Sequence, residues 1–309
     1  MLVIAGPTAI GKTKIAVSVA HQISGEIVSA DSRQVYKGLD IGSGKDLAEY
    51  SMVSPPIPYH LIDNVKPYEE YNVYRFQADA TQVINSIISR GVTPILCGGT
   101  GMYLSSLLQG YRFKPKNDSI SRRNELETLS LSDLQELLKR FGNTHHNTTD
   151  FLVKERLVER ILIEESEATE RINQLQTKLT FPFLLTLERT ALKTRIRSRL
   201  ESRLESGLIE EVHQLLDSGI PEKKLLLFGL EYRYVTMFIR KELYFDEMFQ
   251  KLLSGIFDFA KRQVTWFRKM QREGVAFETI DSSDPDEAIF QILSTYNQQN
   301  EIGNNGIRL

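Results

Sequence analysis

The segment from Gly6 to Thr13 (GPTAIGKT) constrains the fold more than any other part of this 309-residue chain. It matches the phosphate-binding loop pattern G-x-x-x-x-G-K-[ST], follows an apolar run at residues 2–5 and opens an amphipathic stretch. Glycines let backbone N–H groups surround a diphosphate, and the helix N-terminus adds positive charge. Lys12 would bridge phosphate oxygens and the Thr13 hydroxyl would hold Mg²⁺. We expect a diphosphate site made of Gly6, Thr8, Ala9, Ile10, Gly11, Lys12 and Thr13.

Short apolar runs alternate with amphipathic stretches along much of the chain. Strands are expected at residues 2–5, 26–30, 93–97 and 181–187. A helical pattern follows the first strand through Ile23, and another runs from Val73 to Ile88 with Gly91 as its stop. This alternation predicts an α/β fold, a P-loop NTPase-like parallel sheet flanked by helices.

The pattern changes near residue 112. Residues 112–180 are polar, with helical stretches near 131–141 and 152–165 and a His-, Asn- and Thr-rich loop at 143–149. We expect an all-helical insertion domain there. The α/β core would be discontinuous, formed by residues 1–111 and 181–290, with a polar, frayed tail at 291–309.

Charge and composition narrow the classes of protein. The chain has 38 Lys and Arg against 40 Asp and Glu, so it lacks overall basicity. No apolar run reaches the roughly 18–20 residues of a membrane helix, and the single cysteine, Cys97, excludes an internal disulfide. We expect a soluble, cytoplasmic monomer. Residues 189–203 carry six basic side chains, which would form either a polyanion site or a solvated helix face.

Two further segments follow expected strands. Asp31 begins Asp31-Ser32-Arg33-Gln34, and Thr100 lies in Gly98-Gly99-Thr100-Gly101. The carboxyl ends of parallel strands meet at one edge of a sheet, so both should face the phosphate loop. From the residues alone, Asp31 is a general base, a metal ligand or a helix cap. No apolar strand ends in a Walker-B acid, and no arginine-rich lid is evident, which disfavours a small-molecule P-loop kinase.

The chain resembles the tRNA dimethylallyltransferases (tRNA isopentenyltransferases). The resemblance rests on collinear motifs that span nearly the whole chain: GPTAIGKT (6–13), DSRQVY (31–36), GLDIGSGKD (38–46), PYHLID (58–63), GGTGMY (98–103) and AKRQVTWFR (260–268). The stretch at 187–212 also resembles a family helix. The chain departs from the family at Ile256-Phe257, where Thr-Arg is usual, and at Phe228-Gly229-Leu230.

The resemblance implies transfer of a dimethylallyl group from dimethylallyl diphosphate to N6 of the adenosine adjacent to the anticodon. Asp31 would accept the N6 proton, and Thr100 would form hydrogen bonds that position the adenine base and the Asp31 carboxylate. Mg²⁺ on Thr13 would neutralise charge on the leaving diphosphate. Lys261 and Arg262 would also contact the diphosphate. Trp266 is expected to pack in the core.

The resemblance further implies contacts to a tRNA anticodon stem-loop whose adenine is extruded into the site. These contacts would come from Asp31, Ser32, Arg33, Gln34, Thr100, Arg123, Arg156 and Arg160. The insertion would grip the anticodon stem, although its arginines could equally form surface salt bridges. Two alternatives stay open: an adenylate (cytokinin-type) isopentenyltransferase, and a tRNA-binding paralogue whose catalysis is impaired at Ile256-Phe257.

Overall fold

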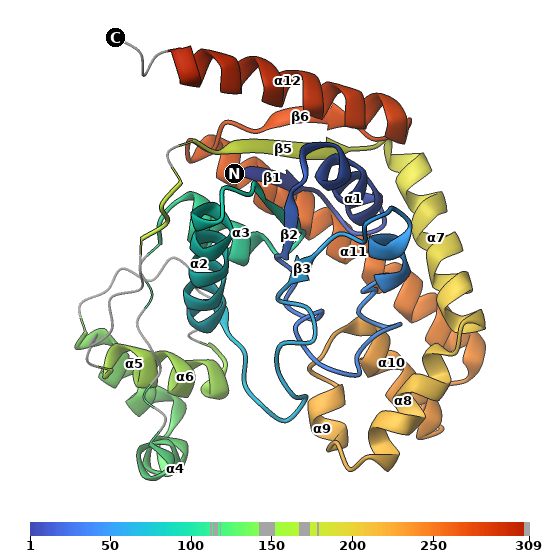
Figure 1. Ribbon diagram of the computed structural model, residues 1–309. Coiled ribbons are helices and arrows are strands. Elements are labelled where there is room, and N and C mark those ends of the chain that lie inside the picture. The colour runs from blue at the N-terminus through green and yellow to red at the C-terminus, as the bar shows by residue number, and fades with distance from the viewer. Residues whose placement is uncertain are drawn as a thin grey trace. The chain divides into compact units, whose positions relative to one another are not determined.

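The computed structural model describes residues 1–111, 113, 117, 119–141, 152–166, 174–177 and 179–305 (Figure 1). The chain divides into two compact units. The core unit comprises Met1–Gly110 and Gln174–Leu309, and the insertion unit comprises Tyr111–Asn173. In the described part of the chain, no helix combines the length and apolar character needed to cross a membrane.

A six-stranded parallel sheet forms the centre of the core unit, with the order β3-β2-β4-β1-β5-β6 (Figure 1). The strands are β1 (Leu2–Ala5), β2 (Glu26–Ser29), β3 (Tyr59–His60), β4 (Pro94–Gly98), β5 (Phe181–Thr186) and β6 (Glu278–Asp281). The four strands expected from the apolar runs are present. The edge strands β3 and β6 were not expected, because they are short and mostly exposed and so give no apolar run.

Helices cover both faces of this sheet. Alternate strand residues point to opposite faces, so Leu2 and Ile4 pack with α1 (Lys12–Ile23) and α12 (Pro285–Asn305). On the other face Val3 and Ala5 pack with α2 (Val73–Ser89), α3 (Gly101–Leu108) and α11 (Phe245–Arg272). The P-loop NTPase-like fold expected from the sequence is therefore confirmed, with β1 near the middle of the sheet.

A group of helices follows β5 in the core unit. They are α7 (Arg189–Glu205), α8 (Leu208–Asp217), α9 (Glu222–Leu225) and α10 (Leu230–Ile239). Gly207 separates α7 from α8 with φ = 98°, a left-handed conformation that glycine adopts without strain. Ile196 and Leu200 of α7 pack against α11 in a separate apolar cluster that includes Ile256.

The carboxyl-terminal segment differs from the expected frayed tail. Helix α12 begins at Pro285 and runs to Asn305, through most of residues 291–309. Ile292 is fully buried, and the Tyr296 hydroxyl lies 3.1 Å from the Thr93 hydroxyl. Polar residues dominate the outer face of this helix. The apolar positions that pack against the sheet were therefore not recognised in the sequence.

The insertion unit has its own small apolar core. Its described helices are α4 (Ile120–Thr128), α5 (Leu131–Lys139) and α6 (Lys154–Glu164). Leu126, Leu134 and Leu157 meet in its centre. Helices α5 and α6 match the expected helical stretches, whereas α4 was not expected. The expected loop at 143–149 lies outside the described residues.

Candidate active site

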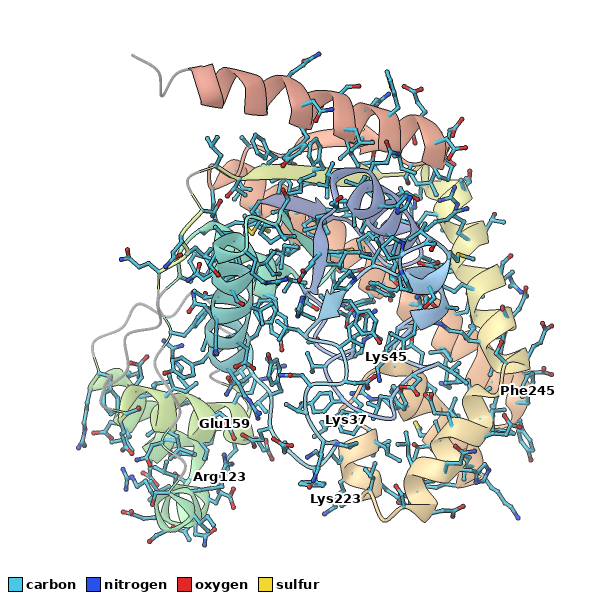
Figure 2. All side chains as sticks on the ribbon, viewed as in Figure 1. Lys37, Lys45, Arg123, Glu159, Lys223 and Phe245 are labelled. Carbon is cyan, nitrogen blue, oxygen red and sulfur yellow. The ribbon has the colours of Figure 1, made fainter. Side chains whose placement is uncertain are left out.

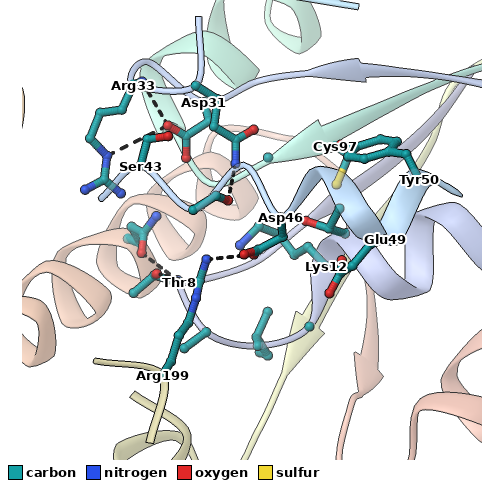
Figure 3. Close-up of a pocket in the computed structure, with 18 residues that line it drawn as sticks. Thr8, Lys12, Asp31, Arg33, Ser43, Asp46, Glu49, Tyr50, Cys97 and Arg199 are labelled. Atoms are coloured by element: carbon teal, nitrogen blue, oxygen red, sulfur yellow. Dashed lines mark hydrogen bonds and ion pairs between the residues drawn. The ribbon is translucent and has the colours of Figure 1, made fainter. Parts of the chain in front are cut away.

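One pocket lies at the carboxyl end of the sheet (Figure 3). The phosphate loop lines it from Thr8 to Thr13. Asp31, Arg33 and Gln34 line it from the segment after β2, and Cys97 and Gly98 line it from the end of β4. The segment between Ser43 and Tyr50 contributes another wall, and Arg199 and Gln263 complete the pocket. Thus most of the expected diphosphate residues and three of the expected tRNA-binding residues share one cavity. Gly6, Ser32 and Thr100 are not among its lining residues.

The phosphate loop is wound tightly around the start of α1. Ala9 and Gly11 have positive φ angles, 61° and 93°, which direct successive backbone N–H groups toward one point. Lys12 is half-buried, and its ammonium group donates to the Pro7 carbonyl oxygen at 2.7 Å. Burial lowers the pKa of Lys12 to about 8, so the side chain is still mainly cationic at neutral pH. The loop therefore presents concentrated positive charge to an anion.

Gln263 on α11 connects the phosphate loop to the end of β4 through two hydrogen bonds. Its Oε1 atom accepts the backbone N–H of Thr8 at 2.8 Å, and its Nε2 donates to the Gly99 carbonyl oxygen at 2.9 Å. A Cβ atom on Gly99 would lie 2.5 Å from Nε2, so a larger residue there would displace the Gln263 amide. Gln263 was missed in the sequence, although it belongs to the AKRQ motif.

Lys261 and Arg262 occupy the same turn of α11 but are exposed and are not among the pocket-lining residues. The structure therefore does not bring these two expected diphosphate contacts to the cavity. Helical spacing explains the difference, because successive residues point about 100° apart and Gln263 is the one directed inward.

Asp31 is half-buried in a turn that follows β2. Its Oδ1 atom accepts the backbone N–H of Arg33 at 2.9 Å, and residues 32–35 form turns and not a helix. The helix-cap interpretation of Asp31 is therefore wrong. The backbone N–H of Ser32 donates to Thr100 Oγ1 at 3.0 Å, so the end of β4 holds the residue next to the carboxylate.

Arg33 and Gln34, expected to contact RNA, are both engaged within the protein. Arg33 pairs with the buried carboxylate of Glu231 at 2.9 Å and lies 5.4 Å from the centre of the Phe259 ring. Gln34 Nε2 donates to the Gly44 carbonyl oxygen at 2.8 Å, and Gln34 Oε1 accepts from the Ser29 hydroxyl. These contacts fix the segment that carries Asp31.

The basic segment of α7 divides into two faces. Arg195, Arg199 and Arg203 are spaced by four residues and point inward. Arg195 donates to the Ile10 carbonyl oxygen at 3.3 Å, Arg199 to Thr8 Oγ1 at 3.3 Å, and Arg203 to Glu231 at 3.3 Å. Arg199 also pairs with Asp46 at 3.1 Å (Figure 3). The inward arginines connect the phosphate loop to its neighbours, and Arg199 also lines the pocket, so this face of α7 is not a solvated helix face.

The oxygen donors of the pocket fit a magnesium ion. Thr13, Asp31, Asp46 and Glu49 line the cavity with hydroxyl and carboxylate oxygens, the donors that Mg²⁺ prefers. Within the described ranges, Glu49 Oε2 is buried without a hydrogen-bond partner, and burial raises the pKa of Glu49 to about 7. No group of three or more His, Cys, Asp or Glu side chains that could hold a metal occurs among these residues. A bound diphosphate would therefore have to supply much of the coordination.

The remaining expected residues lie elsewhere. In the insertion unit, Arg123 pairs with Glu159 (Figure 2), and Arg160 pairs with Glu164 at 2.7 Å. Arg156 also lies in this unit, on α6. In the core unit, Trp266 is partly buried and its Nε1 donates to Ser105 Oγ at 3.0 Å, as expected for packing.

A phosphate loop at the end of a central parallel strand, facing a carboxylate from another strand end, defines a P-loop protein of the α/β class. The comparisons with known proteins narrow this class. A family model described as IPP transferase matches residues 34–270, and one described as isopentenyl transferase matches residues 1–52. The chain belongs to the IPP transferase family, a family of prenyl-transferring enzymes.

Individual relatives agree with this assignment. The chain is 47% identical over 294 residues to tRNA dimethylallyltransferase 1 of Geotalea uraniireducens, covering 95% of this chain and 96% of that protein. It is 42% identical over 303 residues to tRNA dimethylallyltransferase 2 of Porphyromonas gingivalis, covering 96% and 99%. Its structure is similar to that of the tRNA isopentenylpyrophosphate transferase of Bacillus halodurans, with a TM-score of 0.72, 28% identity and coverage of 100% and 99%.

Proposed function

We propose that this chain transfers a dimethylallyl group from dimethylallyl diphosphate to N6 of the adenosine adjacent to the anticodon in tRNA. The observation that carries the proposal is the shared pocket of Lys12 and Asp31, a diphosphate cradle facing a carboxylate. The family and its tRNA-modifying relatives support the choice of substrates. The same proposal includes a monomeric protein acting in the cytoplasm.

The phosphate loop would stabilise the leaving group. As the bond between C1 of the allyl group and the diphosphate oxygen breaks, negative charge builds on the diphosphate and C1 gains positive charge. Lys12, Arg199 and the start of α1 line the pocket in which that charge would develop. Thr13 would hold Mg²⁺ together with diphosphate oxygens, and the ion would neutralise part of the developing charge.

Asp31 would remove the proton from the nucleophile. The exocyclic amine of adenine is barely basic, because its lone pair is delocalised into the ring. It becomes strongly acidic as the new bond between N6 and C1 forms, so a carboxylate can accept its proton. The N–H of Arg33 and the Thr100–Ser32 contact would orient Asp31 for this step.

RNA would be bound by the insertion unit and by the segment after β2. Extruding the target adenine from a stacked loop costs a few kcal/mol, which contacts to the anticodon stem must offset. Arg123 and Arg160 would make such contacts by exchanging their glutamate partners for phosphates, and Arg156 would add a contact from α6. Ile256 is buried in the α7–α11 cluster and Phe257 packs against it, outside the pocket lining. This position favours an active enzyme over the impaired paralogue.

The test follows label from dimethylallyl diphosphate into two acceptors, an adenine-rich anticodon stem-loop and free AMP, with and without Mg²⁺. The proposal expects magnesium-dependent labelling of the RNA only. Labelling of AMP alone would replace it with the adenylate-type activity. RNA binding with no label on either acceptor would replace it with the impaired paralogue.

A further inference from the structure

A buried carboxylate on α8 lies beneath one wall of the pocket. Glu211 is 8% exposed, and its Oε2 atom accepts the backbone N–H groups of Asp40 at 2.9 Å and Ile41 at 2.6 Å. Its Oε1 atom accepts the N–H of Gly42 at 3.0 Å and the hydroxyl of Tyr232 at 2.9 Å. One side chain thus satisfies three consecutive backbone donors that are 169 to 171 residues distant in sequence.

These hydrogen bonds favour one conformation of the backbone at residues 40–42. A buried carboxylate is costly unless hydrogen bonds satisfy both of its oxygens, and three N–H groups converge on it only in this backbone geometry. Gly42 is also pressed against Tyr232, because a Cβ atom at Gly42 would lie 2.6 Å from the Tyr232 ring. From another side, the buried ammonium group of Lys45 contacts Asp40 at 2.5 Å and the Tyr36 carbonyl oxygen at 2.8 Å.

The same loop forms part of the active-site wall. We call residues 40–46 the wall loop; its Ser43, Gly44 and Asp46 line the pocket. The Gly44 carbonyl oxygen accepts from Gln34, in the segment that carries Asp31, and Asp46 pairs with Arg199. The wall loop therefore contacts both the segment of the carboxylate and the arginine beside the phosphate loop.

We propose that Glu211 is a positioning residue for prenyl transfer, which fixes the wall loop and thereby places Gln34 and Arg199. The expected effect on prenyl transfer rests on the proposed function, whereas the expected effect on the wall loop does not. Glu211 does not line the pocket. It acts only through the three backbone N–H groups of residues 40–42.

Glu211→Gln tests this role with little change in volume. The amide has a single acceptor oxygen, so its NH₂ group must face either the N–H groups of Asp40 and Ile41 or that of Gly42. The matched control is Glu210→Gln, the same change at the adjacent, exposed position. Tyr232→Phe is the second variant, since it removes the fourth hydrogen bond and leaves the three backbone contacts in place.

Hydrogen exchange read by mass spectrometry gives the decisive measurement. In Glu211→Gln, amides of the wall loop should exchange about tenfold faster, because a hydrogen bond to a charged group is lost, while peptides of β1 and α1 are unchanged. Magnesium pyrophosphate should bind about tenfold more weakly, with the KM for dimethylallyl diphosphate rising by more than kcat falls. Glu210→Gln should match the wild type, and Tyr232→Phe should change wall-loop exchange less than threefold.

Three results would overturn the inference. The first is unchanged exchange in the wall loop of Glu211→Gln. The second is faster exchange throughout the core unit, which would make Glu211 a general stabilising residue. The third is an effect of Tyr232→Phe as large as that of Glu211→Gln. If Glu211→Gln shows the local change in exchange but the wild-type protein transfers no prenyl group, the proposed function fails while the positioning of the wall loop stands.

Discussion

Gln263 Oε1 accepts the backbone N–H of Thr8 at 2.8 Å, across 255 residues of sequence. The contact joins the long helix α11 to the phosphate loop, and the amide group of the same side chain binds the carbonyl oxygen of Gly99 at the end of β4. A single glutamine thus fixes the relative positions of two strand ends that face the pocket.

Gln263→Ala should therefore loosen the phosphate loop. We expect magnesium pyrophosphate to bind about tenfold more weakly, since two hydrogen bonds with buried backbone groups are lost. Isothermal titration calorimetry measures the change. Gln271→Ala, an exposed glutamine on the same helix, is the control. Equal affinities in both variants would remove Gln263 from the site.

Lys12→Met should weaken diphosphate binding far more. The substitution keeps an unbranched side chain that is one atom shorter and removes the cation that the loop itself supplies. Losing a charge-assisted contact in a desolvated site is expected to cost about 100-fold in affinity. The protein should fold normally, because the cation is held at the cost of desolvation. Unchanged affinity, measured by the same titration, would contradict the assignment of the loop.

The arginines of the insertion unit should act on RNA alone. Arg123→Ala and Arg160→Ala are each expected to raise the KM for the stem-loop and to lower the slope of log affinity against log salt by about one. Diphosphate affinity should stay the same. Arg140→Ala, which removes a more exposed arginine from the same unit, should have a smaller effect. Binding measured at several salt concentrations distinguishes these outcomes, and a uniform slope in all variants would exclude phosphate contacts.

Stability should depend on pH through Glu26, at the amino end of β2. Arg90 contacts its two oxygens at 2.5 and 2.8 Å, and these hydrogen bonds, with one to His60, lower the pKa of Glu26 from 4.5. A lowered pKa stabilises the folded state above the unfolded pKa, and this contribution is lost as pH falls through the folded value.

Glu26→Gln should therefore reduce the free energy of unfolding at pH 7 by about 1–2 kcal/mol. The difference from the wild type should shrink as the pH falls below about 4.5. Urea denaturation at several pH values tests both statements. A difference that stays constant with pH would show that ionisation of Glu26 does not contribute.

The sequence predicted the parts of the site that depend on local pattern. The phosphate loop, Asp31 and Thr100 are each tied to an apolar strand, and the parallel sheet brings the ends of these strands together. Gln263, Arg199 and Glu211 could not be assigned in this way, because their positions depend on the packing of α7, α8 and α11. Gln263 is buried and its neighbours Lys261 and Arg262 are exposed because the three side chains point to different sides of helix α11.

The elements that were not predicted from the sequence share one physical cause. The strands β3 and β6 lie at the edges of the sheet and are largely exposed, so they lack the continuous apolar run of β1 or β4. Helix α12 buries Ala288, Ile289 and Ile292, but most of the residues that follow Tyr296 are polar. In each case a few tertiary contacts stabilise a segment whose local pattern is weak.

In the proposed reaction, Asp31 accepts the proton that N6 loses during prenyl transfer at the phosphate loop. The most direct test is single-turnover transfer from dimethylallyl diphosphate to an anticodon stem-loop, measured side by side for the wild type and Asp31→Asn. Loss of a general base should lower the rate by about 100-fold or more, with diphosphate affinity retained. A rate equal to that of the wild type would contradict the claim.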